Sequence, residues 1–306
     1  MNNQQVTVVA GRQITLTNLN KVLWPRDGLT KAELIRYYAE VYPYLAEHLR
    51  HRPLVVTRFP DGVEGKSFYQ KNAPEHTPPW VATVPVYSEE SRRTIDFVLA
   101  NDLPTMCWLA NQACIELHPW MSRCDKPDYP DFAVIDLDPS EGATYKDACE
   151  VALVLKHVLD QLGLVAYVKT SGATGLHIYI PVKRKHNYEA IRCFTRRIAE
   201  MTVELVPRKA TVVRQVKKRA GRVYVDYLQN VRGKTVCAPY SVRPLPGAPV
   251  STPLRWEEIP DSHPGNFTIR TVLARLQKHG DLFAPVLING QSLLPAWQRL
   301  GLPSAF

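Results

Sequence analysis

The sequence lacks long apolar runs, closely paired cysteines, internal repeats and low-complexity tracts. Because a membrane-spanning helix needs about 20 consecutive apolar residues, the chain offers no candidate for one. The polar start MNNQQVTVVAGRQ lacks the apolar core of a signal peptide. We therefore expect a cytoplasmic protein with reduced thiols and no membrane contact.

The six cysteines show no C-x-x-C spacing. Cys107, Cys114, His118 and Cys124 are close enough in sequence to leave a zinc site open as an alternative, but the gaps between them do not match common zinc patterns. Buried free thiols are the interpretation that this spacing favours.

Basic residues outnumber acidic ones. Lys and Arg number 38 against 29 Asp and Glu, which gives a formal net charge of +9. Phosphate neutralisation by Lys and Arg supplies most non-specific affinity for nucleic acid, so this balance is compatible with a polyanionic partner. An ordinary basic enzyme remains the alternative. The basic residues cluster in the segments 183–185, 192–197 and 208–222.

The 306 residues predict an α/β protein with two joined parts, 1–126 and 127–306. The first is an N-terminal α/β module in which Thr30 and Glu33 form a capping box, and Pro43 is expected to kink or restart the helix that follows. The second shows the order strand, helix, strand, strand, helix, strand of a ferredoxin-like sheet. The predicted strands are 131–138, 165–170, 176–182, 211–216 and 222–229, and the predicted helices are 146–162 and 187–206.

Three aspartates on predicted strands are the candidate catalytic residues. Asp136 and Asp138 project from the same face of their strand because side chains alternate. Two like charges held this close are costly unless a cation lies between them, and paired carboxylates suit Mg²⁺ or Mn²⁺. Solvated aspartates at a strand end are the alternative. Asp226 favours the metal site, because an unpaired carboxylate on an apolar strand is expensive to bury.

A glycine-containing turn lies between these strands. Its backbone amides and the Ser171 and Thr174 hydroxyls could form a nest for phosphate oxygens, with His177 donating from the next strand. A plain hairpin turn and a structural histidine are the alternative. Arg219, Arg222 and Arg243 flank the third aspartate in sequence, and planar guanidinium groups suit triphosphates. Simple surface charge remains open for Arg222 and most of the basic runs.

Taken together, these motifs resemble the archaeo-eukaryotic primase superfamily and, more narrowly, the polymerase domain of bacterial ligase D. The likeness extends over nearly the whole chain, because flanking stretches match as well. The motifs are Asp136-x-Asp138, Ser171-Gly172-x-Thr174-Gly175-x-His177 and Asp226, and the flanking stretches are 18–25, 114–120 and 238–244.

The resemblance implies a primase-polymerase fold, with a ferredoxin-like catalytic sheet packed on the N-terminal module. It implies that the three aspartates bind two divalent ions, Mn²⁺ or Mg²⁺, and that the turn contacts an incoming NTP or dNTP. It further places Arg219 and Arg243 near the triphosphate and His118 near the sugar. Lys21 and Lys31 would grip the 5′-phosphate of a downstream strand, and Phe68 and Tyr69 would stack on a base.

Two departures stand out. Thr174 occupies a position where many relatives carry lysine, and Tyr69 stands where a second phenylalanine is frequent. No ligase or nuclease domain is present in these residues, so a free-standing polymerase would require a separate DNA ligase and a Ku-type end-binding protein. The implied role is addition of nucleotides, preferably ribonucleotides, at gapped, 5′-phosphorylated or broken DNA ends in end joining.

Two other functions remain open on the residues alone. Paired carboxylates also serve metal-dependent nucleases and phosphoesterases, which would shorten DNA without nucleotides. A non-catalytic end-bridging module would bind DNA after chelation of metals, although it has no need for three converging carboxylates.

Overall fold

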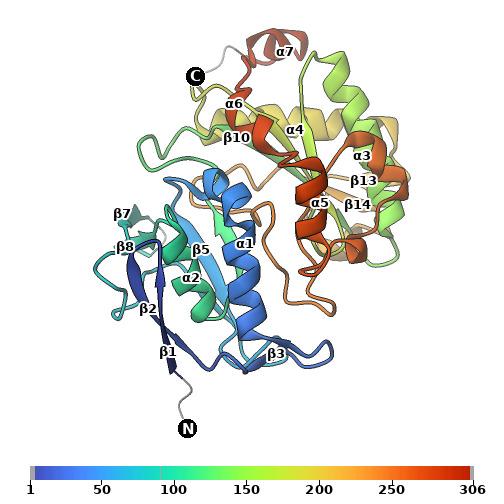
Figure 1. Cartoon of the computed structure of the whole chain (residues 1–306). Helices are drawn as coiled ribbons and strands as arrows, with labels where there is room; N and C mark the ends of the chain where they lie inside the picture. Colours follow the sequence, from blue (N-terminus) through green and yellow to red (C-terminus); the bar gives the residue numbers. More distant parts are fainter. Residues whose placement is uncertain (1–3, 90, 304–306) are drawn as a thin grey trace. The chain divides into compact units, whose positions relative to one another are not determined.

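The computed structural model describes residues 4–89 and 91–303, which form two compact units (Figure 1). The predicted parts were each continuous in sequence, but the units are not. The first unit holds Met1–Trp120, Cys237–Ser251 and Phe267–Gly280, and the second holds Met121–Val236, Thr252–Asn266 and Asp281–Phe306. Within the described residues, no helix is both long and apolar enough to span a bilayer.

In the first unit the long helix α1 (Lys31–Leu49) starts at the predicted capping box. Thr30 Oγ1 accepts from the Glu33 amide at 3.4 Å, and the Thr30 amide donates to Glu33 Oε2 at 2.8 Å. The predicted restart of the helix at Pro43 is wrong, because α1 continues through this residue. Leu45 and Leu49, which follow Pro43, are buried in the core, and this packing offsets the lost backbone hydrogen bond.

A five-stranded sheet packs in the same unit with α1 and a second helix, and two short hairpins accompany it. Strand β5 is its centre, pairing with β6, β8 and β9. The bounds are β1 (Gln4–Val9), β2 (Arg12–Thr17), β3 (Val22–Trp24), β4 (Leu29–Thr30), β5 (Leu54–Arg58), β6 (Phe68–Gln70), β7 (Thr83–Ser88), β8 (Arg93–Val98), α2 (Leu103–Asn111), β9 (Cys114–Pro119) and α5 (Val272–His279).

The C-terminal segments of the first unit complete its core. The hydroxyl of Tyr37 donates to the carbonyl of Tyr240 at 2.8 Å, and the Ala238 amide donates to the Leu117 carbonyl at 2.9 Å. Ala238, Tyr240 and Val242 are all buried in one cluster with residues of α1 and β9. The N-terminal module therefore depends on chain that follows the whole catalytic sheet.

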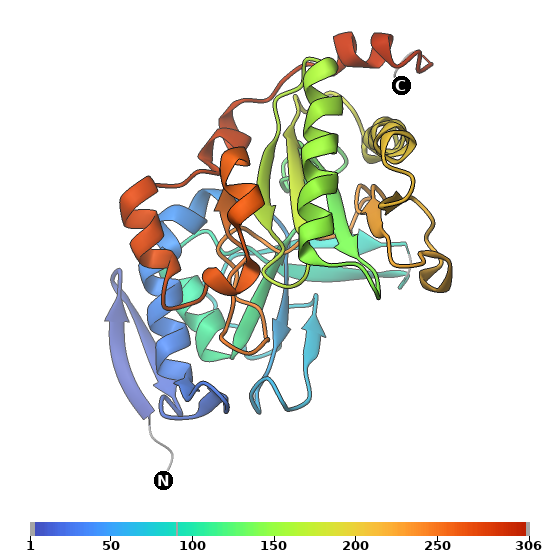
Figure 2. The same ribbon diagram turned by 90° about the vertical axis from the view of Figure 1, so that its right-hand side faces the viewer.

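The second unit is built on a six-stranded sheet in the order β13-β14-β10-β12-β11-β15. Its four central strands, with α3 and α4 between them, have the predicted connectivity of a ferredoxin-like sheet (Figure 2). The bounds are β10 (Phe132–Pro139), α3 (Tyr145–Gln161), β11 (Tyr167–Thr170), β12 (Leu176–Pro181), α4 (Tyr188–Leu205), β13 (Ala210–Thr211), β14 (Val223–Asp226), β15 (Pro253–Leu254), α6 (Ala284–Ile288) and α7 (Leu294–Arg299), with short 3-10 helices at Val216–Lys218, Trp256–Asp261 and Pro264–Asn266.

Helices α3 and α4 pack together and against β10 and β14. Side chains alternate along β10, so the fully buried Ile135 and Leu137 face one way while Asp136 and Asp138 face the other. Amphipathic α3 and α4 cover the apolar face. The carboxylates thus belong to the opposite face of the sheet.

The predicted strand 211–216 is mostly wrong. Only Ala210 and Thr211 pair with β14, and the chain from Val213 to Lys218 is exposed and ends in a 3-10 turn. Val213 and Val216, which made the segment look like a strand, have no sheet partner to pack on and are 38% and 66% exposed.

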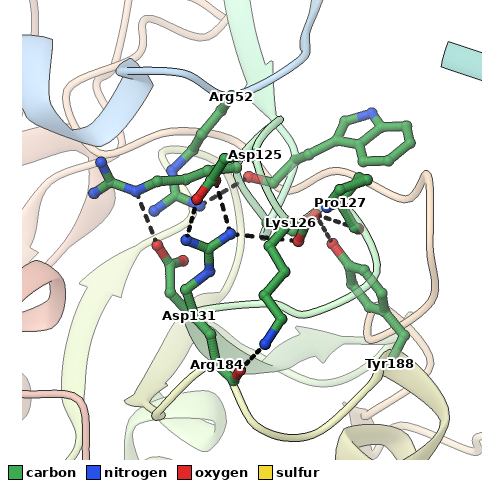
Figure 3. Close-up of polar contacts among 10 residues, drawn as sticks. Arg52, Asp125, Lys126, Pro127, Asp131, Arg184 and Tyr188 are labelled. Atoms are coloured by element: carbon green, nitrogen blue, oxygen red, sulfur yellow. Dashed lines mark hydrogen bonds and ion pairs between the residues drawn. The ribbon is translucent and has the colours of Figure 1, made fainter.

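Polar contacts fix the segment that leads into β10 (Figure 3). Arg184 forms a bidentate pair with Asp125, both distances being 2.8 Å, and Lys126 Nζ donates to the Arg184 carbonyl at 2.8 Å. The hydrogen bonds from Arg184 hold the pKa of Asp125 below its usual value. Part of the basic run 183–185 therefore has a structural role. Arginines of the run 192–197 also pair with acids, since Arg196 lies 2.8 Å from Glu200 on α4.

The capping box of α1 gives a direct stability test. Thr30→Ala removes the acceptor for the Glu33 amide and should lower the unfolding free energy of the first unit by about 1 kcal/mol, measured as a lower urea midpoint in circular dichroism. Thr30→Ser keeps the oxygen and should retain most of the stability. Equal midpoints for Thr30→Ala and the parent would contradict a role for this cap.

Candidate functional site

The three predicted aspartates lie together on one face of the second unit's sheet. Asp136 of β10 is the direct cross-strand partner of Asp226 of β14, and opposed side chains in an antiparallel pair have Cβ atoms about 5 Å apart. Asp138 follows two residues later on the same face. The register of one ladder therefore brings Asp226 beside two carboxylates of β10 that are far from it in sequence.

Asp226 is held by donors from its own strand and from the turn that follows it. The Leu228 amide donates to Oδ1 at 2.7 Å, Gln229 Nε2 donates to Oδ2 at 3.0 Å, and the Tyr224 hydroxyl donates to Oδ1 at 3.2 Å. These three hydrogen bonds orient the carboxylate. Gln229 and Tyr224 were not among the residues predicted from the sequence.

Asp138 is paired with Arg219, whose Nη1 lies 3.3 Å from Oδ2. The guanidinium lies over the Tyr224 ring at 3.9 Å from its centroid, and the Arg219 side chain is largely buried. Burial raises the pKa of Asp138, Arg219 opposes this rise, and the charge of Asp226 adds to it. Arg219 was predicted to lie near a triphosphate, and here it supplies the counter-charge of a carboxylate.

The chemistry of the three carboxylates fits hard divalent ions, which prefer oxygen ligands. Their positions, however, do not form a complete metal site. Among the described residues, no group of three His, Cys, Asp or Glu side chains is arranged to hold a metal ion. Arg219 and a divalent ion would be alternative counter-charges for the Asp138 carboxylate.

His177 is the cross-strand partner of Asp136 on its other side, and its Nε2 lies 3.5 Å from Asp136 Oδ1. Behind it, the fully buried Lys169 places Nζ 2.8 Å from His177 Nδ1 and 5.7 Å from the Tyr179 ring centroid. A charged Lys169 can only donate a hydrogen bond, so His177 Nδ1 must accept it. The proton of a neutral His177 imidazole then lies on Nε2, which faces Asp136. The sequence did not single out Lys169.

Hydrogen bonds within the turn close the segment that follows Lys169. Ser171 Oγ accepts from the amides of Ala173 and Gly175 at 3.1 and 3.0 Å, and the Ser171 amide donates to the Gly175 carbonyl at 2.8 Å. These two amides therefore bond within the turn, and contact of the turn with phosphate stays a prediction. Gly172 has a positive φ of 76° and Thr174 is exposed.

Gly175 is where β12 approaches β10. A Cβ built on residue 175 would lie 2.0 Å from the Leu137 carbonyl oxygen, a distance that no side chain tolerates. The glycine is therefore required for the spacing between β12 and the strand that carries Asp136 and Asp138, whatever it contributes to a ligand.

The first unit carries the other predicted residues. Lys21 Nζ lies 2.9 Å from Asp61 Oδ1 on the surface. Lys31 is buried, and its Nζ donates to Thr17 Oγ1 and to the Asn111 carbonyl, both at 3.1 Å. Burial, followed by the charge of Lys21, lowers the pKa of Lys31 to about 8.

The predicted aromatic pair is exposed, with Phe68 at 47% and Tyr69 at 57%. As neighbours on β6 they project from opposite faces of the strand. Tyr69 lies toward His118, with ring centroids 6.1 Å apart, whereas the Lys66 ammonium lies over Phe68 at 5.6 Å. The two rings are not placed to act as one stacking surface.

Arg243 and His118 converge on a residue that the sequence did not single out, Glu116. Arg243 Nε lies 2.9 Å from Glu116 Oε1, and His118 Nε2 lies 3.5 Å from Glu116 Oε2. The argument that singled out Asp226, a carboxylate on an apolar strand, applies equally to Glu116 in Cys-Ile-Glu-Leu-His.

Comparison with known families agrees with this geometry. The family described as "LigD, primase-polymerase domain" matches residues 30–283. The chain belongs to this family. The resemblance predicted from the motifs is thereby confirmed.

Relatives in the family include longer proteins. The bifunctional non-homologous end joining protein LigD of Bacillus subtilis is 36% identical over 282 residues, which cover 91% of this chain and 45% of that protein. The multifunctional non-homologous end joining protein LigD of Mycolicibacterium smegmatis is 33% identical over 276 residues, covering 90% and 36%. The chain thus spans less than half the length of these relatives.

A solved structure described as "Polymerase Domain from Mycobacterium tuberculosis Ligase D in complex with DNA" superposes with a TM-score of 0.85. It is 31% identical to this chain and covers 91% of it and 99% of the other chain. The predicted mixed α/β primase-polymerase fold is therefore confirmed.

Gly175→Ala tests the contact between β12 and β10 in this LigD-type sheet. The added methyl overlaps the Leu137 carbonyl, so we expect a loss of about 1–3 kcal/mol in unfolding free energy, measured by urea denaturation. Thr174→Ala, one residue away and exposed, should unfold like the parent. A Gly175→Ala protein as stable as Thr174→Ala would disprove the steric constraint.

Proposed function

We propose that this chain is a metal-dependent nucleotidyltransferase of the primase-polymerase type. The reaction joins a primer 3′-oxygen to the α-phosphorus of an NTP or dNTP, while the bond between the α- and β-phosphates breaks and pyrophosphate leaves. The observation that carries the proposal is the set of three carboxylates on one sheet face, Asp136, Asp138 and Asp226, in a member of this family.

Each group of the second unit has a role in this proposal. Asp136, Asp138 and Asp226 would hold two divalent ions, Mn²⁺ or Mg²⁺, which when bound neutralise charge on the transferred phosphoryl group and polarise its oxygens. Arg219 offers a cation beside Asp138 for the leaving phosphates. Ser171, Gly172, Thr174 and Gly175 form the turn toward the nucleotide, and His177 keeps Asp136 oriented through Nε2.

The proposed substrates are gapped, 5′-phosphorylated or broken DNA and nucleotides, with ribonucleotides preferred. The names of the relatives support a place in non-homologous end joining, and the DNA bound in the similar structure supports DNA as the partner. Lys21 and Lys31 would receive the 5′-phosphate, and the exposed Phe68 and Tyr69 would contact bases. A DNA ligase and a Ku-type end binder would act with the polymerase, as separate proteins or as parts of a longer one.

Removal of the paired carboxylates tests the reaction. Asp136→Ala with Asp138→Ala should lower primer extension by at least about a thousandfold, because metal-assisted charge stabilisation is worth several kcal/mol. Binding of a fluorescent gapped duplex should persist. Asp160→Asn, which alters an exposed ion pair on α3, serves as the control.

Other outcomes separate the alternatives. Extension by the double variant at the parental rate would refute the proposal. Shortening of the primer with Mn²⁺ and no nucleotide would indicate a nuclease. DNA binding that survives chelation, without extension by the parent protein, would indicate an end-bridging module.

The pKa of Lys31 predicts a pH dependence for recognition of the 5′-phosphate. A lysine is charged below its pKa, so an amine with a pKa of about 8 is an ammonium at pH 7 and largely neutral at pH 9.5. The preference for a 5′-phosphorylated gap over an unphosphorylated one should therefore fall about tenfold over this range, the worth of one charge-assisted hydrogen bond.

The measurement is the ratio of dissociation constants for the two duplexes by fluorescence anisotropy. Lys21→Gln removes a neighbouring positive charge that lowers the pKa of Lys31, so the midpoint of the decline should move to higher pH. A ratio that stays constant from pH 7 to 9.5 in the parent protein would rule out Lys31 as the contact.

A further inference from the structure

A row of polar side chains crosses the sheet of the first unit. Tyr69 of β6, Thr57 of β5 and Glu116 of β9 are successive cross-strand partners, so their side chains lie on one face. His118 follows Glu116 by two residues and shares that face. The row therefore sets an aromatic ring, a hydroxyl, a carboxylate and an imidazole side by side.

Glu116 is the buried carboxylate of this row, only 8% exposed. Burial alone raises the pKa of its carboxyl group, but the hydrogen bond with His118 and the charge of Arg243 outweigh burial, and the pKa lies below its usual value. The side chain is thus a carboxylate with two cationic or donor partners. Thr57 Oγ1 lies 3.4 Å from His118 Nε2 and also faces this carboxylate.

Hydrogen bonds hold the backbone segment that carries Arg243. The Arg243 amide donates to the Pro249 carbonyl at 2.8 Å, and the Ser241 hydroxyl accepts from the Leu117 amide at 2.9 Å. The segment is therefore fixed to β9 next to Glu116, and the ion pair fixes the remaining freedom of the long side chain.

We propose that Glu116 is a positioning residue for the incoming nucleotide. By holding Arg243 and His118 with its two oxygens, it sets the separation and orientation of a guanidinium suited to triphosphate oxygens and an imidazole suited to a sugar hydroxyl. Tyr69 lies beside His118 for contact with the base. The inference rests on the proposed function and adds to it a single carboxylate that aligns two nucleotide contacts.

The test is steady-state extension of a gapped duplex by Glu116→Gln, which keeps the shape of the side chain and removes its charge. We expect the KM for nucleotide to rise about tenfold while kcat stays within about threefold. The ratio of kcat/KM for ribonucleotides to that for deoxyribonucleotides should also change, because His118 is no longer held. Glu47→Gln, which removes an exposed ion pair of the same unit, should leave all three values unchanged.

A double-mutant cycle separates positioning from folding. If Glu116 acts through Arg243, the effects of Glu116→Ala and Arg243→Ala on KM should be far from additive, whereas a general loss of structure would lower kcat and the thermal midpoint. A parental KM and an unchanged sugar ratio in Glu116→Gln, or additive effects in the cycle, would overturn the inference. If the parent protein itself fails to extend primers, the proposed function fails instead, and binding of nucleoside triphosphate to parent and Glu116→Gln still decides the role of Glu116.

Discussion

The close approach of β12 to β10 is the constraint on which the catalytic face depends. It exists because residue 175 carries no side chain, and a Cβ there would lie 2.0 Å from the Leu137 carbonyl. With β12 at this distance, β10 is central in the sheet, and Asp136 has His177 on one side and Asp226 on the other. The position of each functional group then follows from strand register and the alternation of side chains.

Three carboxylates on one face of a sheet would repel one another if none of them had a cationic or hydrogen-bonding partner. The structure gives each one a different partner: Arg219 for Asp138, His177 backed by Lys169 for Asp136, and neutral donors from the following turn for Asp226. The first unit uses the same principle around Glu116. In both units a carboxylate withdrawn from water is paired with a donor, and the same pairs orient the groups predicted to meet the substrate.

The sequence predicted the sheet and the three aspartates because these depend on local pattern. Period-two alternation placed Asp136 and Asp138 on one face, and the capping box of Thr30 and Glu33 marked the start of α1. Contacts between side chains of neighbouring strands leave no such pattern, and so Lys169 was missed. Glu116 was also missed, although the argument used for Asp226, a carboxylate on an apolar strand, applies equally to it. The segment after Thr211 was wrong because its valines have a strand's composition but no neighbouring strand to pair with.

The path of the chain through the two units has a consequence for biosynthesis. The core of the first unit contains Tyr240, Val242 and Leu276, which leave the ribosome long after Trp120. The N-terminal segment therefore cannot reach its final packing while the catalytic sheet is being made. It stays partly unfolded until Tyr240, Val242 and Leu276, which complete its core, have been synthesised. Non-local closure of this kind slows folding and exposes apolar surface in the meantime. Expression of the first 120 residues alone is thus expected to give an aggregation-prone fragment.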